Sequence, residues 1–162
     1  MENREQIERI EFFLNTVVLE ELGKLQDAGL TYMHFVIMGQ AVEVLGGFLD
    51  QKPMKAKGQS AHRFAAAVRY LLGGRYRLLN ENNFLYDKLR NQMTHTFLPG
   101  GDLILVRTGE EKGYTHLEIK DKHLVLVADT FYEDRRRACG RLVQLLKEGR
   151  IKPKNIAFGN DN

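Results

Sequence analysis

The stretch from residue 31 to 49 constrains the fold more than any other part of the chain, because it is apolar and has one acid, Glu43, and no Lys or Arg. A helix that is apolar on all sides lies at the centre of a bundle, since an exposed side would place hydrocarbon in water. An extended conformation for its C-terminal half is the alternative that the pattern leaves open. Gly39, Gly46 and Gly47 would each weaken the helix by about 1 kcal/mol relative to alanine, and they allow neighbouring helices to cross closely. The apolar residues are Met33, Phe35, Val36, Met38, Val42, Val44, Leu45 and Phe48.

The remaining periodicity predicts further helices and a few strands. Apolar spacing and helix-ending residues predict helices at residues 4–27, 60–72, 81–97 and 129–148. Alternating residues predict strands at 103–106, 114–120 and 123–127. We therefore expect a mainly α protein: a four- to five-helix bundle with a small three-stranded antiparallel β-meander, residues 102–127, inserted before the last helix. Residues 1–150 would form a single domain, and residues 151–162 a frayed C-terminal tail.

Composition excludes several classes of protein. A hydrophobic content of 43% is sufficient for a core. The sequence has no apolar run of the roughly 18 residues that a membrane span needs, and the charged N-terminus does not resemble a secretory signal. We expect a cytoplasmic protein with no membrane association. The single cysteine, Cys139, excludes an internal disulfide and a cysteine-ligated zinc site, and we predict a core role for it and no metal or cofactor.

Positive charge is concentrated in one stretch, although the net charge is only +3. Residues 51–80 contain seven cations and no acid, whereas the rest of the chain has 24 − 7 = 17 cations against 21 acids. Such a stretch indicates contact with a polyanion such as RNA, with Tyr70 and Tyr76 available for base stacking. The alternative is an exposed face with no ligand. The seven predicted phosphate- or RNA-binding residues are Lys52, Lys55, Lys57, Arg63, Arg69, Arg75 and Arg77.

Arg90 and His95 form the candidate catalytic pair. On an α-helix they differ by about 140° of rotation and about 7.5 Å of rise, so the long arginine side chain can curl toward a group beside the imidazole. The guanidinium would hold phosphate oxygens, and the imidazole would act as general base or acid on a ribose 2′-hydroxyl. The alternative is structural: Asp87 and Arg90 would form a surface ion pair, and His95 would interact with the negative end of its helix. Glu43 would pair with Arg90 or His95. The alternative is that it reaches the surface or pairs with another arginine.

The segment Leu85–His95 resembles the signature helix of the HEPN superfamily, all-α domains in which an Arg is followed after four to six residues by a His, often with a polar residue directly after the Arg. Asn91 occupies that polar position. The resemblance implies a homodimer with two motif helices facing each other across a cleft, and metal-independent endoribonuclease activity that leaves a 2′,3′-cyclic phosphate. Some members are toxins paired with a nucleotidyltransferase-like antitoxin, and others are inactive. On this basis Arg90 would hold phosphate, His95 would be the acid or base, Asn91 would orient them, and Tyr86, Asp87 and Glu43 would support them.

Two functions follow. The first is a HEPN-like, metal-independent endoribonuclease or RNA-binding toxin-type protein that acts at a dimer cleft. The second is a non-catalytic helical dimerisation module of HEPN-like fold that binds a protein or a nucleotide. Outside the motif, His34 and His62 are expected at surface or partly buried positions, and His116 and His123 on neighbouring strands make only a weak metal site. The run Arg135–Arg137 would be neutralised by Glu133 and Asp134.

Overall fold

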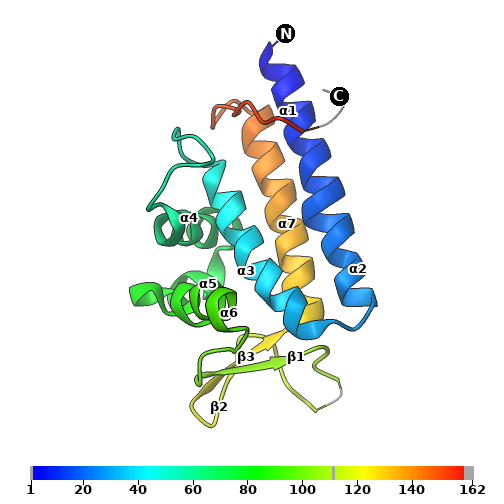
Figure 1. The fold of residues 1–162 in the computed structure, drawn as a ribbon, viewed down its shortest axis with the longest axis vertical. Coiled ribbons are helices and arrows are strands. Elements are labelled where there is room, and N and C mark those ends of the chain that lie inside the picture. Colours follow the sequence, from blue (N-terminus) through cyan, green and yellow to red (C-terminus); the bar gives the residue numbers. More distant parts are fainter. Residues whose placement is uncertain (1, 111, 159–162) are drawn as a thin grey trace.

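The apolar stretch forms the central helix of the molecule. The computed structural model describes residues 2–110 and 112–158. In it, α3 (Thr31–Gly47) lies between the long helices and a group of shorter ones (Figure 1). Phe35, Val42 and Leu45 are fully buried. The helical prediction for this stretch is therefore confirmed, and the extended alternative is wrong.

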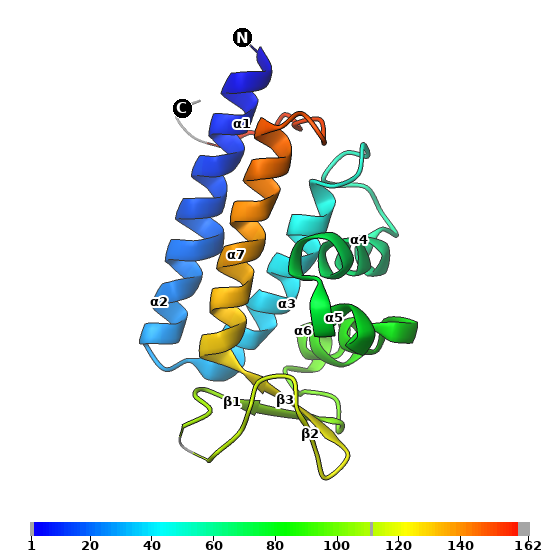
Figure 2. The ribbon, with the colours of Figure 1, turned by 180° about the vertical axis from the view of Figure 1, so that it is seen from behind.

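Two long helices pack beside α3. The first runs without a break from α1 (Glu2–Phe13) through the π-helical segment η1 (Leu14–Glu21) into α2 (Leu22–Asp27). It ends just before Gly29, which has a φ of 71°. The second is α7 (Ala128–Lys147), which lies alongside α1, α2 and α3 in both views (Figures 1 and 2).

Shorter helices cover the other side of α3. α4 (Ser60–Ala67) continues into the π-helical segment η2 (Val68–Leu72), and α5 (Gly74–Leu79) follows. After the short η3 (Glu81–Asn83), the π-helical segment η4 (Tyr86–Asn91) runs into α6 (Gln92–Thr96). The described residues therefore form six helical segments, and the predicted number of four to five is wrong. The additional segment is α5, because the chain resumes a helix immediately after Gly73, where we expected an end.

The sheet is mixed, so the prediction of an antiparallel meander is wrong. β1 (Leu103–Val106) pairs in parallel with β3 (His123–Val127), and β2 (Ile119–Lys120) pairs antiparallel with β3 on its other side. The predicted strand at 114–120 is reduced to two residues because Leu117 adopts a φ of 66°, which a strand cannot contain. The predicted tight turn is present: Asp121 and Lys122 both have positive φ, as a two-residue hairpin turn requires.

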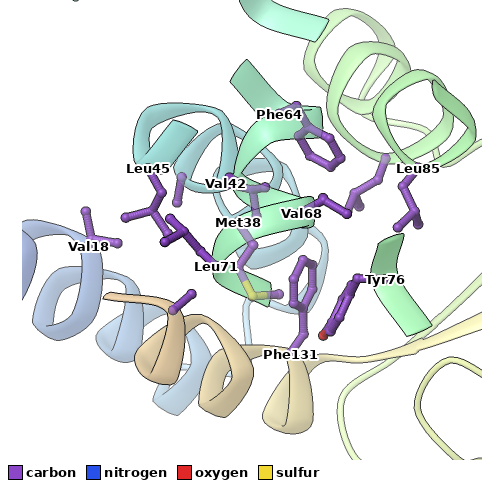
Figure 3. Close-up of a cluster of buried hydrophobic side chains, with 14 of the residues drawn as sticks. Val18, Met38, Val42, Leu45, Phe64, Val68, Leu71, Tyr76, Leu85 and Phe131 are labelled. Atoms are coloured by element: carbon purple, nitrogen blue, oxygen red, sulfur yellow. The ribbon is translucent and has the colours of Figure 1, made fainter. Parts of the chain in front are cut away.

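One contiguous core joins the helices and the sheet. Side chains from α3, α4, η2, α5 and α7 meet around Met38, Val68 and Phe131 (Figure 3). One of the predicted glycines, Gly46, permits this packing. A β-carbon on Gly46 would overlap the backbone carbonyl of Arg63, so α3 and α4 touch backbone to backbone there. The expected close helix crossing is therefore present.

The C-terminal segment up to Phe158 folds back on the helices. Ile151 and Ile156 pack against the core, and the Phe158 ring contacts the rings of Phe12 and Phe13 at 5.6 and 5.2 Å. Lys154 donates to the backbone carbonyl of Gly47. The prediction of a frayed tail is thus wrong for residues 151–158, and residues 159–162 lie outside the described residues.

Asp50 joins that segment to the loop after α3. Its carboxylate accepts hydrogen bonds from Arg63 Nε at 2.7 Å and from Lys154 Nζ at 2.7 Å. Burial opposes ionisation of Asp50, but the hydrogen bonds from Arg63, Lys154 and the backbone N–H of Lys52 outweigh it and hold the pKa well below its usual range. The loop that follows α3 is further held by hydrogen bonds from Arg63 to the carbonyls of Pro53 and Met54. None of the helices in the described part of the chain is long and apolar enough to cross a membrane.

Candidate functional site

Arg90 is placed by a π-helical turn that presses against a glycine. In η4 the N–H of Gln92 bonds to the carbonyl of Asp87, five residues earlier, and this wide turn brings the backbone of Arg90 onto α3. A β-carbon on Gly39 would lie 3.1 Å from Arg90 Cα, so any larger residue would require the two backbones to move apart slightly. Turns of this type are rare and are frequently found at functional sites. The wider winding also reduces the offset between Arg90 and His95 below the roughly 140° of an ideal α-helix.

The side chain of Arg90 is held by Glu43, one helical turn after Gly39 on α3. Arg90 Nε donates to Glu43 Oε2 at 2.5 Å, and both side chains are largely buried, with 17% and 19% of their surface exposed. The two Nη groups of Arg90 make no hydrogen bond to the described residues, and they are not enclosed. The guanidinium is therefore oriented through Nε, and its Nη groups are not used by the fold. The alternative ion pair between Asp87 and Arg90 is not formed, and of the partners we weighed for Glu43 the structure shows Arg90.

His95 lies on the last turn of α6 and is exposed. Thr94, next to it, donates from its hydroxyl to the carbonyl of Arg90, four residues earlier, at 2.6 Å. Asn91 is partly exposed, and its side chain makes no hydrogen bond within residues 2–110 and 112–158. The imidazole and the amide are both free to contact a ligand.

Tyr86 and Asp87 take different positions. The ring of Tyr86 packs edge-on against Phe64 at 5.7 Å, and its backbone N–H bonds to Asn80 Oδ1 at 3.0 Å, so it helps to hold the start of η4. Asp87 is exposed. Tyr86 therefore acts as a support for the helix, and Asp87 shows no contact that ties it to Arg90.

Exposed apolar side chains adjoin the motif. Phe97 and Leu98 come two and three residues after His95 and are 60% and 63% exposed. Phe97 ends α6 in the left-handed conformation, with a φ of 57°, which is a strained choice for a bulky residue. Strain of this kind persists where the surroundings or the function require it.

The seven cations of residues 51–80 do not form one groove. Arg63 is 5% exposed and is committed to Asp50, so its predicted contact with phosphate or RNA is wrong. Tyr76 is buried and cannot stack on a base. Lys52, Lys55 and Lys57 lie on the loop after α3, whereas Arg69, Arg75 and Arg77 are exposed on η2 and α5. Tyr70 is 54% exposed with Arg69 near its ring.

A second polar cluster, which we did not predict, joins α5, the loop before β2 and α7. The backbone N–H of Val127 donates to His116 Nδ1 at 2.9 Å, so the ring proton is on Nε2 and points to the Tyr76 hydroxyl at 2.6 Å. Tyr76 in turn donates to Asp134 at 2.7 Å. Burial lowers the pKa of His116 to about 4 and, with the charge of Asp134, raises that of Tyr76.

His34 and Arg135 lie in the interior. His34 is fully buried, so the expectation of a surface or partly buried position is wrong. Its Nδ1 bonds to Gln26 Oε1 at 2.5 Å, and burial together with the charge of Arg135 lowers its pKa to about 4. Arg135 is also fully buried, and its guanidinium has no hydrogen-bond partner among the described residues, although it contacts the Tyr132 ring at 4.8 Å.

Neighbouring arginines behave as expected. Arg136 pairs with Glu133 at 2.8 Å and Arg137 with Asp134.

Cys139 is buried, which raises the pKa of its thiol to about 12, so it is a core residue and not a nucleophile. Within the described residues no three His, Cys, Asp or Glu side chains form a group that would hold a metal ion.

Comparison with known proteins gives no assignment. No protein-family model, no curated protein and no solved structure matches this chain.

Proposed function

We propose that this protein is a HEPN-like, metal-independent endoribonuclease that acts at a cleft between two copies of the chain. Arg90 is the phosphate-holding residue, His95 is the acid or base, and Asn91 is the polar residue that orients the scissile group. The observation that carries the proposal is the Arg90 side chain, which Glu43 fixes through Nε while its two Nη groups have no hydrogen bond to a described residue.

The chemistry follows from these groups. A neutral His95 removes the proton from a ribose 2′-hydroxyl, whose oxygen attacks the adjacent phosphorus. The bond from phosphorus to the 5′-oxygen then breaks, and that oxygen receives a proton, which leaves a 2′,3′-cyclic phosphate. Arg90 stabilises the additional negative charge on the phosphate oxygens as the bond forms.

A second copy would complete the site. The exposed side chains of Phe97 and Leu98 lie directly beside His95, where a partner would remove them from water. The pockets of about 760, 660 and 520 Å³ lie elsewhere and are not lined by Arg90 or His95. A site on an open surface becomes enclosed when two copies place their motif helices face to face.

The second candidate is a non-catalytic dimerisation module that binds a protein or a nucleotide. The observation that favours it is again the pair between Arg90 and Glu43, because the carboxylate neutralises the charge that would attract phosphate. In that case Arg90 and His95 would be structural or relic residues.

Single-turnover cleavage of a structured RNA in EDTA separates the two. We expect the native protein to cut, and His95→Ala and Arg90→Ala each to lower the rate by on the order of 100-fold or more. His62→Ala, which changes an exposed histidine on α4, is the matched control and should leave the rate unchanged. Absence of cleavage by the native protein, or cleavage that survives both changes, would contradict the nuclease and favour the module.

A further inference from the structure

A second basic site lies between α5 and α7, away from the motif helix. The segment from Leu71 to Tyr76 and one side of α7 enclose a pocket of about 520 Å³. Its walls include the three arginines Arg75, Arg137 and Arg141, and one acid, Asp134. A hollow of this size accommodates a phosphoryl group together with the atoms attached to it.

The fold compensates the charge in this pocket only at Arg137, which pairs with Asp134. Arg137 and Arg141 are four residues apart on α7, and like charges at this spacing destabilise a helix. Arg75, on α5, adds a third cation to the same hollow. Neither Arg75 nor Arg141 has a hydrogen bond or an ion pair with any residue in the described part of the chain. Three arginine side chains therefore line one pocket, although repulsion between them is unfavourable for the fold.

Asp134 neutralises Arg137 and has no ion pair with Arg75 or Arg141. One of its oxygens accepts the Tyr76 hydroxyl, and the other accepts Arg137. Since Tyr76 is in turn held by His116, whose other nitrogen is fixed by the backbone of Val127, the carboxylate is locked in place. The cluster therefore fixes the floor of the pocket and orients Arg137, while Arg75 and Arg141 remain available.

We propose that this pocket binds a phosphoryl group, either a phosphomonoester or a pyrophosphate. Planar guanidinium groups bind phosphate oxygens through two parallel hydrogen bonds, and three of them match the oxygen atoms that such a group presents. Gln144 also lines the pocket, and its amide nitrogen donates to Glu148 Oε1 at 2.7 Å, which leaves one amide hydrogen for a ligand. The site uses none of the residues of the proposed nuclease centre, so each proposal can fail without the other.

Calorimetric titration with inorganic pyrophosphate at low salt tests the site. We expect the native protein to bind, and Arg141→Gln and Arg75→Gln each to weaken binding by about tenfold or more, because each removes a charge-assisted contact. Neither residue has a partner in the described structure, so the fold should persist, which circular dichroism would verify. Arg136→Gln is the matched control: it removes the same charge from the same helix, outside the pocket, and should change the affinity by less than about twofold.

The source of the phosphoryl group is distinguished by two further ligands. If only ATP competes with pyrophosphate, the natural ligand is a free nucleotide. If a 5′-phosphorylated oligoribonucleotide binds more tightly than its 5′-hydroxyl counterpart, the ligand is an RNA end. Either result would support the site. Failure of pyrophosphate to bind would overturn the proposal. Equal loss of affinity in Arg136→Gln and Arg141→Gln would overturn it as well, since binding would then reflect the net charge of the helix.

Discussion

Gly39 lies directly beneath Arg90, with the place of its missing β-carbon 3.1 Å from Arg90 Cα. Glu43 is one turn further along the same face of α3, and its carboxylate accepts a hydrogen bond from Arg90 Nε. The first residue therefore sets how closely the motif helix approaches, and the second sets the direction of the guanidinium. The site depends on the spacing of these two positions on the central helix.

Replacement of Gly39 by alanine should destabilise the protein, although alanine is normally the better helix former. The added methyl group forces η4 away from α3, and we expect the free energy of unfolding to fall by about 1–3 kcal/mol. Gly140→Ala is the control, because a β-carbon at Gly140 meets open space, and it should raise stability by about 0.5–1 kcal/mol. Urea denaturation measures both. An increase for Gly39→Ala would show that the two helices are not in close contact.

Glu43 should affect cleavage through the orientation of Arg90. In Glu43→Ala the guanidinium loses its one hydrogen-bond acceptor among the described residues, and we expect the single-turnover rate to fall by about tenfold or more. Glu43→Gln retains an acceptor oxygen at the same position and should keep most of the rate. Equal rates for both variants would indicate that the pair has no part in positioning.

Arg135→Met should stabilise the fold. The guanidinium of Arg135 is buried without a hydrogen-bond partner in the described structure, and burial lowers its pKa to about 10, which reflects the cost of holding a charge there. An apolar side chain of similar length removes that cost, and we expect a gain of about 1–4 kcal/mol in the free energy of unfolding. Arg136→Met, at an exposed position, should change it by less than about 0.5 kcal/mol. A loss of stability in Arg135→Met would mean that the charge has a favourable partner.

Stability should fall as the pH is lowered from 6.5 to 4. His34 and His116 have folded-state pKa values of about 4 because both are buried, whereas the unfolded chain takes up their protons near pH 6.5. The unfolded state therefore binds more protons throughout this range, and each histidine lowers the free energy of unfolding by about 1.4 kcal/mol per pH unit. Urea denaturation from pH 7 to 4.5 gives the slope. His116→Gln should reduce it by about half, exposed His62→Gln should leave it unchanged, and a flat profile would contradict the burial of both rings.

Asp50→Asn should cost about 3–5 kcal/mol, because it leaves Arg63 buried without its charged partner and releases Lys154. Asp27→Asn, which removes an exposed carboxylate at the end of α2, should have little effect. Thermal unfolding followed by circular dichroism gives the difference. A similar small effect for both would show that the two cations find other acceptors.

The helices were predictable because their signals are local. The apolar pattern of residues 31–49 predicted the central helix, and that prediction should have extended to His34, since a helix at the centre of a bundle buries most of its side chains. The direction of β1 could not be predicted in the same way. It depends on where the chain is turned by Leu117, a residue with no sequence signal for positive φ.

The burial of Arg63 and Arg135 could not be predicted from local sequence signals either. Arg63 and Arg135 have the sequence context of surface cations, yet both are buried by helices that are distant along the chain. Glu43 was singled out because it is an isolated acid in an apolar helix, and this signal identified a true ion pair with Arg90. The Tyr76–His116–Asp134 cluster combines three distant segments, and no spacing in the sequence connects them.

The parallel pairing of β1 and β3 limits how this protein can be redesigned. Neighbouring strands that run in the same direction cannot be joined by a two-residue turn, because the chain must first return to the starting edge. β1 and β2 lie on opposite sides of β3, so the segment between Val106 and Ile119 must pass across β3, and a compact hairpin linker cannot replace it. A loop grafted between β1 and β2 must therefore keep the length of the present segment, whereas the Asp121–Lys122 turn can accept standard hairpin sequences.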